Sequence, residues 1–171
     1  MTGAASGLSS SCMPAAGKFE RLWFDLQEWG LTQMDRFGTL TGHAPAMAPH
    51  LVTGLLGERR ALFELGRRGM IIVARRWTSA KVRGDIDLIG WDGDRLCFVE
   101  VKTRTARDMT PAESAVDDQK RDQVRSLARA YLRGFPESER RSIRVRFDVV
   151  SVYLLGGITE FEFFEGAYGW R

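Results

Sequence analysis

The chain has 171 residues, of which 44% are hydrophobic and 27% are charged, and its formal net charge is +3 at pH 7. This composition is typical of a globular protein with a core of ordinary size, and it excludes a largely disordered chain. Two cysteines, Cys12 and Cys97, are too few for a disulfide framework. No apolar run reaches the roughly 18 residues of a membrane-spanning helix, and the N-terminus lacks the pattern of a signal peptide. We therefore expect a cytoplasmic protein with no membrane partner.

The first 53 residues are predicted to be an N-terminal extension. Residues 1–17 are rich in Ala, Ser and Gly, a composition typical of disordered segments. From Lys18 to Trp29 the apolar side chains recur at helical spacing, which predicts a short amphipathic helix that ends at Gly30. Residues 38–54 contain several Pro and Gly residues and are predicted to be a linker.

Residues 54–171 are predicted to form one folded domain. The predicted elements are a helix over Leu55–Arg68, a strand at Met70–Ala74 buried on both faces, a β-hairpin over Gly84–Lys102, a helix over Ser114–Arg133, and strands at Ser142–Leu154 and Ile158–Phe164. The second helix is long enough to cross back to a parallel neighbouring strand. The order α-β-β-β-α-β-β therefore predicts an α/β fold, in which helices flank a mixed central β-sheet.

The hairpin is the most informative stretch of the chain. Its two halves, Gly84–Ile89 and Leu96–Lys102, are rich in β-branched and aromatic residues, and Asp-Gly between them favours a tight turn. Because strand side chains alternate, Glu100 and Lys102 point to the same face. The sequence therefore places a carboxylate and an ammonium group side by side within an apolar strand.

The position of Asp87 depends on the turn. A loop of Gly93–Asp94 would place Asp87 opposite Glu100, whereas a loop of Asp92–Gly93 would place it opposite Phe98. Either register leaves Asp87 on the face of Glu100 and Lys102, and only a bulge would break this arrangement. Two carboxylates this close together repel each other, so a cation is expected between or beside them.

Two further polar residues interrupt the apolar stripes of the predicted helices. Glu58 falls on the inward stripe of the first helix and Lys120 on that of the second. A Glu at the first turn of a helix can also be favoured by the helix dipole, and a Lys stem can lie along apolar surface, so both positions have a purely structural interpretation as well.

A basic segment precedes the hairpin and another basic residue follows it. These residues are Arg75, Arg76, Lys81 and Arg83, in a connection that also carries Trp77, and Arg104. A basic loop beside carboxylates suits a phosphate backbone, although a solvated loop explains the pattern equally well.

An Asp, a Glu about a dozen residues later and a Lys two residues after that Glu form a metal-nuclease signature. Carboxylate oxygens are hard ligands that suit Mg²⁺ or Mn²⁺, and such a metal lowers the pKa of bound water and neutralises charge on a phosphate. A lysine can hold the attacking water or stabilise the phosphate oxygens in the transition state. Asp87, Glu100 and Lys102 have this pattern.

The combined motifs resemble the bacterial YraN-like family, which is usually described as predicted endonucleases of the restriction-endonuclease-like superfamily, related to archaeal Holliday-junction resolvases. The motifs are Gly57-Glu58-X-X-Ala61, Gly84-Asp85-Ile86-Asp87-Leu88-Ile89, Phe98-Val99-Glu100-Val101-Lys102-Thr103-Arg104, Lys120 and Arg146-Phe147-Asp148-Val149-Val150. The family usually has Glu at the position of Asp85, and the first fifty residues have no counterpart in it.

The resemblance implies a restriction-endonuclease-like fold and hydrolysis of DNA, with branched or flapped DNA as a candidate substrate. It implies that Asp87 and Glu100 are metal ligands, that Lys102 is the catalytic lysine, and that Glu58 is an additional ligand or positions the water. Lys120 matches a family position of unassigned role, and we group it with the basic residues above as nucleic-acid-binding. By analogy, the chain is expected to form a homodimer.

Two alternatives remain open at the sequence level. One is a non-catalytic nucleic-acid-binding module that keeps the nuclease fold. The other is an interaction protein that acts through the helix at 18–29.

Overall fold

The computed structural model describes residues 18–40, 48–106 and 118–170. Within these ranges the elements are α1 (Lys18–Leu40), α2 (Pro49–Arg67), β1 (Ile71–Ser79), β2 (Val82–Asp92), β3 (Arg95–Arg104), α3 (Asp118–Leu132), α4 (Glu137–Arg140), β4 (Arg144–Leu155) and β5 (Ile158–Tyr168). From α2 onward, this is the predicted order with the short α4 added.

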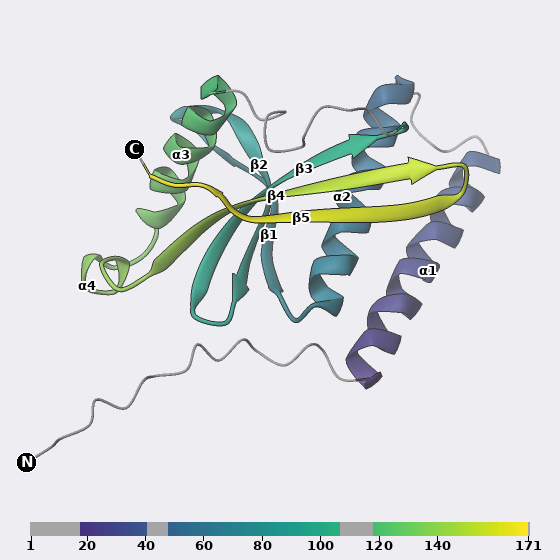
Figure 1. Cartoon of the computed structure of the whole chain (residues 1–171), viewed down its shortest axis with the longest axis horizontal. Coiled ribbons are helices and arrows are strands. Elements are labelled where there is room, and N and C mark those ends of the chain that lie inside the picture. The colour runs from purple at the N-terminus through teal and green to yellow at the C-terminus, as the bar shows by residue number, and fades with distance from the viewer. Residues whose placement is uncertain (1–17, 41–47, 107–117, 171) are drawn as a thin grey trace, which may run out of the picture.

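The five strands form one mixed sheet in the order β1-β2-β3-β4-β5 (Figure 1). All neighbours are antiparallel except β3 and β4, which are parallel. A parallel pair needs a crossover connection, and α3 lies in the connection between β3 and β4. The predicted fold class, a mixed α/β sheet with flanking helices, is confirmed.

Each face of the sheet is covered by a helix. On one face, Ala61 and Leu65 of α2 pack against a cluster that includes Val99 and Val101 of β3. On the other face, Val124, Leu127 and Ala128 of α3 pack against a cluster that includes Ile86, Phe98 and Phe147. The alternation of β3 explains this division, because Val99 and Val101 face α2 while Phe98 faces α3.

The N-terminal helix differs from its prediction. Instead of ending at Gly30, α1 continues to Leu40. It packs on α2, where the Phe24 ring lies so close to Gly66 that an added Cβ would approach the ring to 2.7 Å. Glu28 is buried and pairs with Arg60 at 2.8 Å and also with Arg67. These contacts offset the roughly 1 kcal/mol that a glycine costs within a helix.

Other predicted boundaries also shift. The predicted linker at 38–54 is helical at both ends, because α1 reaches Leu40 and α2 begins at Pro49, while residues between them lie outside the described ranges. The predicted disordered segment 1–17 also lies outside those ranges, as does the start of the helix expected from Ser114. None of the described helices is both long and apolar enough to cross a membrane.

The prediction that the Met70–Ala74 run is buried on both faces is wrong. β1 lies at the edge of the sheet, and Ile71 and Val73 are 60% and 46% exposed. The apolar run alone cannot distinguish a central strand from an edge strand whose outer side is left uncovered.

The basic connection after this run is also not a loop. Arg75 and Arg76 continue β1, and Arg83 lies in β2, so only Lys81 of this set stands in the turn. Trp77 points inward and makes an edge-to-face contact with Tyr131 at a centroid distance of 5.2 Å. It therefore serves the core under α3 rather than a nucleic-acid surface.

Candidate functional site

The site begins where β2 separates from β3. Asp92 pairs with Arg95 next to the turn, so the two-residue loop is Gly93–Asp94. The paired register of β2 and β3 extends from there to Leu88, which lies opposite Val99. This is the register that places Asp87 next to Glu100.

Asp87 leaves the ladder at this point. Ile86 and Ile89 both belong to the cluster under α3, whereas Leu88 belongs to the cluster under α2, so the alternation of β2 is broken around Asp87. The Asp87 carboxylate accepts the backbone N–H of Val101 at 2.7 Å, a donor that an uninterrupted ladder would have paired with backbone. The carboxylate therefore stands in the gap that opens between the two strands.

Glu100 is the buried centre of the site, with only 4% of its side chain exposed. Lys102 lies 3.0 Å from its Oε1, and Lys120 of α3 lies 3.0 Å from its Oε2. A buried carboxylate is costly unless it is paired, and here each oxygen has its own ammonium group. Sequence reasoning placed Lys120 inward but assigned it to the nucleic-acid surface; the structure brings it into direct contact with Glu100.

Glu58 reaches the site from α2, which covers the opposite face of the sheet from α3. The sequence placed Asp87, Glu100 and Lys102 on one face and Glu58 on the inward side of its helix; the structure brings Glu58 to the other three from the opposite face, at the end of β3 where the strands separate. A single strand pattern could not predict this meeting, because it does not say where the sheet opens.

A close helix–strand approach positions Glu58. At the neighbouring Gly57, an added Cβ would lie only 1.8 Å from Oγ1 of Thr103 on β3. Glycine is therefore required at this point for α2 to lie as close to β3 as it does. Arg76 stands nearby, with its Nε 3.9 Å from Glu58 and 3.5 Å from Asp85. Arg76 is also the one non-glycine residue in the described ranges with positive φ, at 45°.

A second close approach positions α3. Gln123 donates a hydrogen bond of 2.8 Å to the carbonyl of Arg83, and an added Cβ at Gly84 would lie 2.3 Å from the Gln123 side chain. Gly84 also has a φ of 97°, which other residues adopt only with strain. The first residue of the Gly84-Asp85-Ile86-Asp87 motif is thus a glycine chiefly because of its backbone conformation, and the Gln123 hydrogen bond ties α3 to the start of β2.

The electrostatics of the site follow from burial and crowding. Burial, together with the nearby Glu100, raises the pKa of Asp87 from 3.8 to about 7. Burial also raises the pKa of Glu58, an effect that Asp85 and Glu100 reinforce and Arg76 opposes. Burial lowers the pKa of Lys120, but the pairing with Glu100 outweighs it, so the pKa is raised overall. The acidic side chains of Glu58, Asp85, Asp87 and Glu100 thus stand among the basic side chains of Arg75, Arg76, Lys102 and Lys120.

A cavity of about 470 Å³ opens onto these groups. Its lining residues are His50, Thr53, Gly54, Glu58, Asp87, Glu100, Val101, Lys102, Thr103 and Thr105. Sequence reasoning missed His50, because α2 was expected to begin after it. An earlier helix start, at the Pro that favours the first helical turn, is the signal that could have found it.

The oxygen donors of this cavity are of the type that hard divalent cations prefer. As they stand, no three His, Cys, Asp or Glu side chains of the described residues are arranged to hold a metal ion. Both Glu100 oxygens lie within ion-pair distance of lysines and one Asp87 oxygen is hydrogen-bonded to backbone, so these side chains would have to exchange partners to bind one.

The predicted nucleic-acid-binding residues are not among those that line the cavity. Lys81 and Arg83 are exposed at the β1–β2 turn, and Arg104 ends β3. Arg75 instead lines a separate apolar groove beside α1.

Comparison with known proteins gives a family. Residues 57–152 match the model of the uncharacterised protein family UPF0102. The chain belongs to this family. The chain is 48% identical over 110 residues to a UPF0102 protein of Koribacter versatilis, an alignment that covers 64% of this chain and 74% of the relative. It is 44% identical over 115 residues to a UPF0102 protein of Solibacter usitatus, covering 67% and 84%, and 46% identical over 109 residues to one of Rhodococcus opacus, covering 63% and 87%.

The resemblance to the YraN-like family is confirmed by this UPF0102 membership. The family match contains Glu58, Asp87, Glu100, Lys102 and Lys120, and it begins after α1 and the first half of α2. The charged side chains of the cavity thus lie within the matched region, whereas His50, Thr53 and Gly54 of its lining and the whole of α1 lie outside it.

Proposed function

We propose that this UPF0102 protein is a divalent-metal-dependent endonuclease that hydrolyses DNA phosphodiester bonds, with branched or flapped DNA as the candidate substrate. The observation that carries the proposal is the convergence of Asp87, Glu100, Lys102 and Glu58 on one cavity, from a strand pair and from a helix on the other face. A purely structural ion pair between Lys102 and Glu100 does not explain why two further carboxylates are held beside it at a cost in burial.

Asp87, Glu100 and Glu58 are the residues that would hold Mg²⁺ or Mn²⁺. The metal would supply activation of water and charge neutralisation at the phosphate. Asp87 and Glu100 fit this role by their oxygen donors and by their mutual repulsion, which a cation would relieve. Burial of Glu100 keeps bulk water away from its carboxylate, so electrostatic interactions there are stronger than at an exposed surface.

Lys102 is proposed to hold the attacking water or a phosphate oxygen. Its ammonium already lies at the rim of the cavity, 3.0 Å from Glu100 and with 30% of the side chain exposed, so it can reach a bound phosphate without a change in the strand. The exposed Lys81 and Arg83 would contact the phosphate backbone outside the cavity, where they position DNA without reading its sequence.

The test is a cleavage assay on linear, nicked, flapped and four-way DNA with Mg²⁺ or Mn²⁺, compared with chelator. We expect metal-dependent cleavage that Lys102→Met abolishes while the circular dichroism spectrum stays native. Arg141→Met is the control. Arg141 also forms an ion pair with an acidic residue, Glu137, but its side chain is 80% exposed and it lies far from the cavity residues in the sequence. Equal cleavage by wild type and Lys102→Met would refute the assignment.

The same assay decides the alternative of a non-catalytic nucleic-acid-binding module. That function is supported by the two lysines, because each pairs with one oxygen of Glu100 and so satisfies the buried carboxylate. It predicts DNA binding that persists in chelator, weakens steeply with salt, and is never followed by cleavage.

A further inference from the structure

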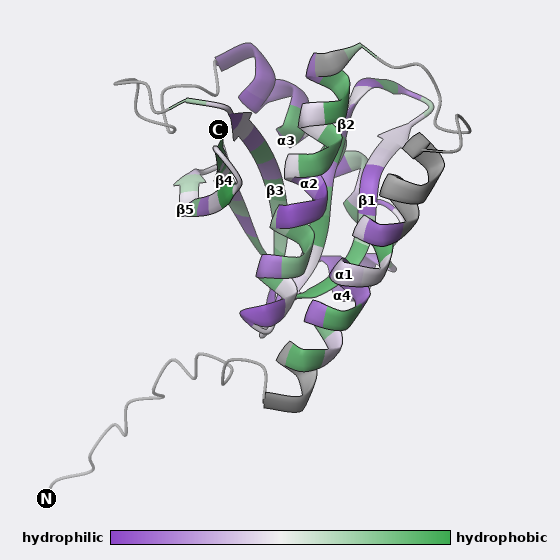
Figure 2. Cartoon of the chain, turned by 90° about the vertical axis from the view of Figure 1, so that its right-hand side faces the viewer, coloured by the Kyte–Doolittle hydropathy of each residue, from purple (hydrophilic) through white to green (hydrophobic). Residues whose placement is uncertain are grey.

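The outward face of α1 is the feature that the proposed function does not use. Leu22, Trp23, Leu26 and Trp29 are 57–65% exposed, although they are among the largest apolar side chains of the chain. The helix is anchored to α2 by its other side, through Phe24 and the buried Glu28. Figure 2 shows α1 as an outer layer beside α2, with hydrophobic segments along its ribbon.

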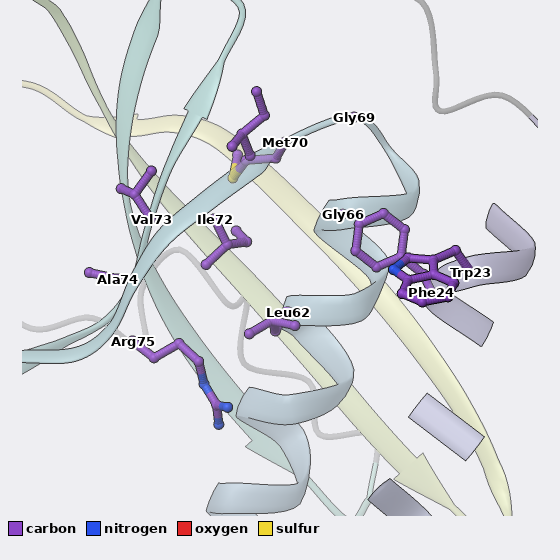
Figure 3. A pocket seen from close by; sticks show the side chains of 11 residues that line it. Trp23, Phe24, Leu62, Gly66, Gly69, Met70, Ile72, Val73, Ala74 and Arg75 are labelled. Carbon is purple, nitrogen blue, oxygen red and sulfur yellow. The ribbon is translucent and has the colours of Figure 1, made fainter. Parts of the chain in front are cut away.

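The exposed face continues into an apolar groove. The groove has a volume of about 900 Å³ and lies between Trp23 and Phe24 of α1, Leu62 and Gly66 of α2, and the edge strand β1 (Figure 3). Ile71 and Val73 of β1, which are 60% and 46% exposed, are among the residues that line it. The four α1 residues, the groove and these two residues together form what we call the α1 face.

The size of the α1 face matches a protein interface. At these exposures each tryptophan presents roughly 150 Å² and each leucine roughly 100 Å², so the four α1 side chains present about 500 Å² per copy. If two copies buried all of this area, they would together bury roughly 1,000 Å² from α1 alone, which is the lower limit for a specific interface, and Ile71 and Val73 would add to it. Single exposed apolar residues need no partner, whereas a contiguous patch of several hundred Å² is often an interaction site.

Charge argues against an anionic occupant. Residues 18–40 contain three basic and four acidic residues, so α1 would not be attracted to DNA or to an anionic lipid surface. Asp25 and Glu28 are moreover paired with an arginine of α2, so their charges are already neutralised and would not attract a basic partner. An apolar patch without a charge pattern is complementary to itself, which is the requirement of a two-fold symmetric interface.

We propose that the α1 face is the interface of a homodimer of this chain. The groove and the acidic cavity share no lining residue: Leu62 and Gly66 of α2 line the groove, whereas Gly54 and Glu58 line the cavity, so a contact at the groove leaves the cavity open. The dimer thus carries two accessible cavities. It is independent of the proposed nuclease function, since it rests only on α1, the groove and β1.

The experiment measures the mass of the full chain by sedimentation and light scattering over a micromolar concentration series. We expect a dimer of twice 19.3 kDa and a dissociation constant that rises at least about tenfold in Leu26→Arg and in the double variant Trp23→Ser/Trp29→Ser. Ile158→Ser is the matched control, because Ile158 is 64% exposed at the β4–β5 turn, and its dimer should be unchanged.

Three outcomes overturn the proposal. A wild-type chain that stays monomeric throughout the series removes the dimer. A dimer that both α1 variants leave intact, with native circular dichroism, places the interface elsewhere. Sedimentation of the monomer with phosphatidylglycerol vesicles, lost in Leu26→Arg, assigns the α1 face to a membrane surface instead.

Discussion

Replacing Gly57 by alanine tests the contact that brings α2 to the sheet. Gly57 lies in the middle of α2, where a glycine-to-alanine change by itself stabilises a helix by about 0.5–1 kcal/mol. The added Cβ would, however, lie 1.8 Å from Oγ1 of Thr103 and 2.8 Å from its Cβ and Cγ2. Rotation of the Thr103 side chain cannot relieve all three contacts, because its own Cβ is among them.

Overpacking of this kind costs typically about 1–3 kcal/mol, which exceeds the gain in helix propensity. We therefore expect Gly57→Ala to lower the free energy of unfolding by about 1–2 kcal/mol, which corresponds to roughly 2–8 °C in Tm for a domain of this size. Urea denaturation followed by circular dichroism measures the change.

Gly54→Ala is the control within the same helix. No atom lies within 4 Å of a Cβ built at Gly54, so this variant should gain about 0.5–1 kcal/mol. The double variant Gly57→Ala/Thr103→Ala should be more stable than the sum of its two single changes predicts, since two of the three clashing atoms are removed. A Gly57→Ala variant as stable as Gly54→Ala would refute the close approach of α2 to β3, and with it the position of Glu58.

Two other predictions concern the buried charges. The pKa of Asp87 is about 7 in the folded protein and 3.8 ordinarily, so the wild type loses stability as the pH rises between these two values. In metal-free buffer, Asp87→Asn should therefore stabilise the protein at pH 7.5 but not at pH 4. Urea midpoints at both pH values measure this, and an equal effect at both would contradict the burial of a charge beside Glu100. Glu28→Ala should release α1 from α2 and speed hydrogen exchange in α1, because it leaves Arg67 without its buried partner. Asp25→Ala is the control: it removes only an exposed ion pair and should change the exchange rates little. Slow exchange in α1 of Glu28→Ala would show that apolar contacts alone hold the helix.

The sequence alone predicted the hairpin and its polar residues. Asp-Gly between two β-rich runs located the turn but left its register open, and the two-residue periodicity of β3 put Glu100 and Lys102 on one face with Phe98. The inward positions of Glu58 and Lys120 followed from helical periodicity. These are local properties, because turn preference and side-chain direction depend on a few neighbouring residues.

The roles proposed for Asp87, Glu100, Glu58 and Lys102 stay predictions, as does the metal. What the structure adds is their arrangement: Lys120 pairs with Glu100, and Asp87 takes the backbone N–H of Val101. Neither contact could be predicted, because each depends on how closely a second element approaches.

Local pattern determined what each segment of this protein is, and tertiary structure decided what each segment touches. The apolar run at Met70–Ala74 specified a strand, yet its place at the sheet edge depends on the pairing of β2 with β3 and β4. The apolar pattern of α1 specified a helix, yet the helix continues past Gly30 because α1 packs on α2. Periodicity along one element fixes the direction of its side chains, whereas the free energy of burial depends on neighbours far along the chain.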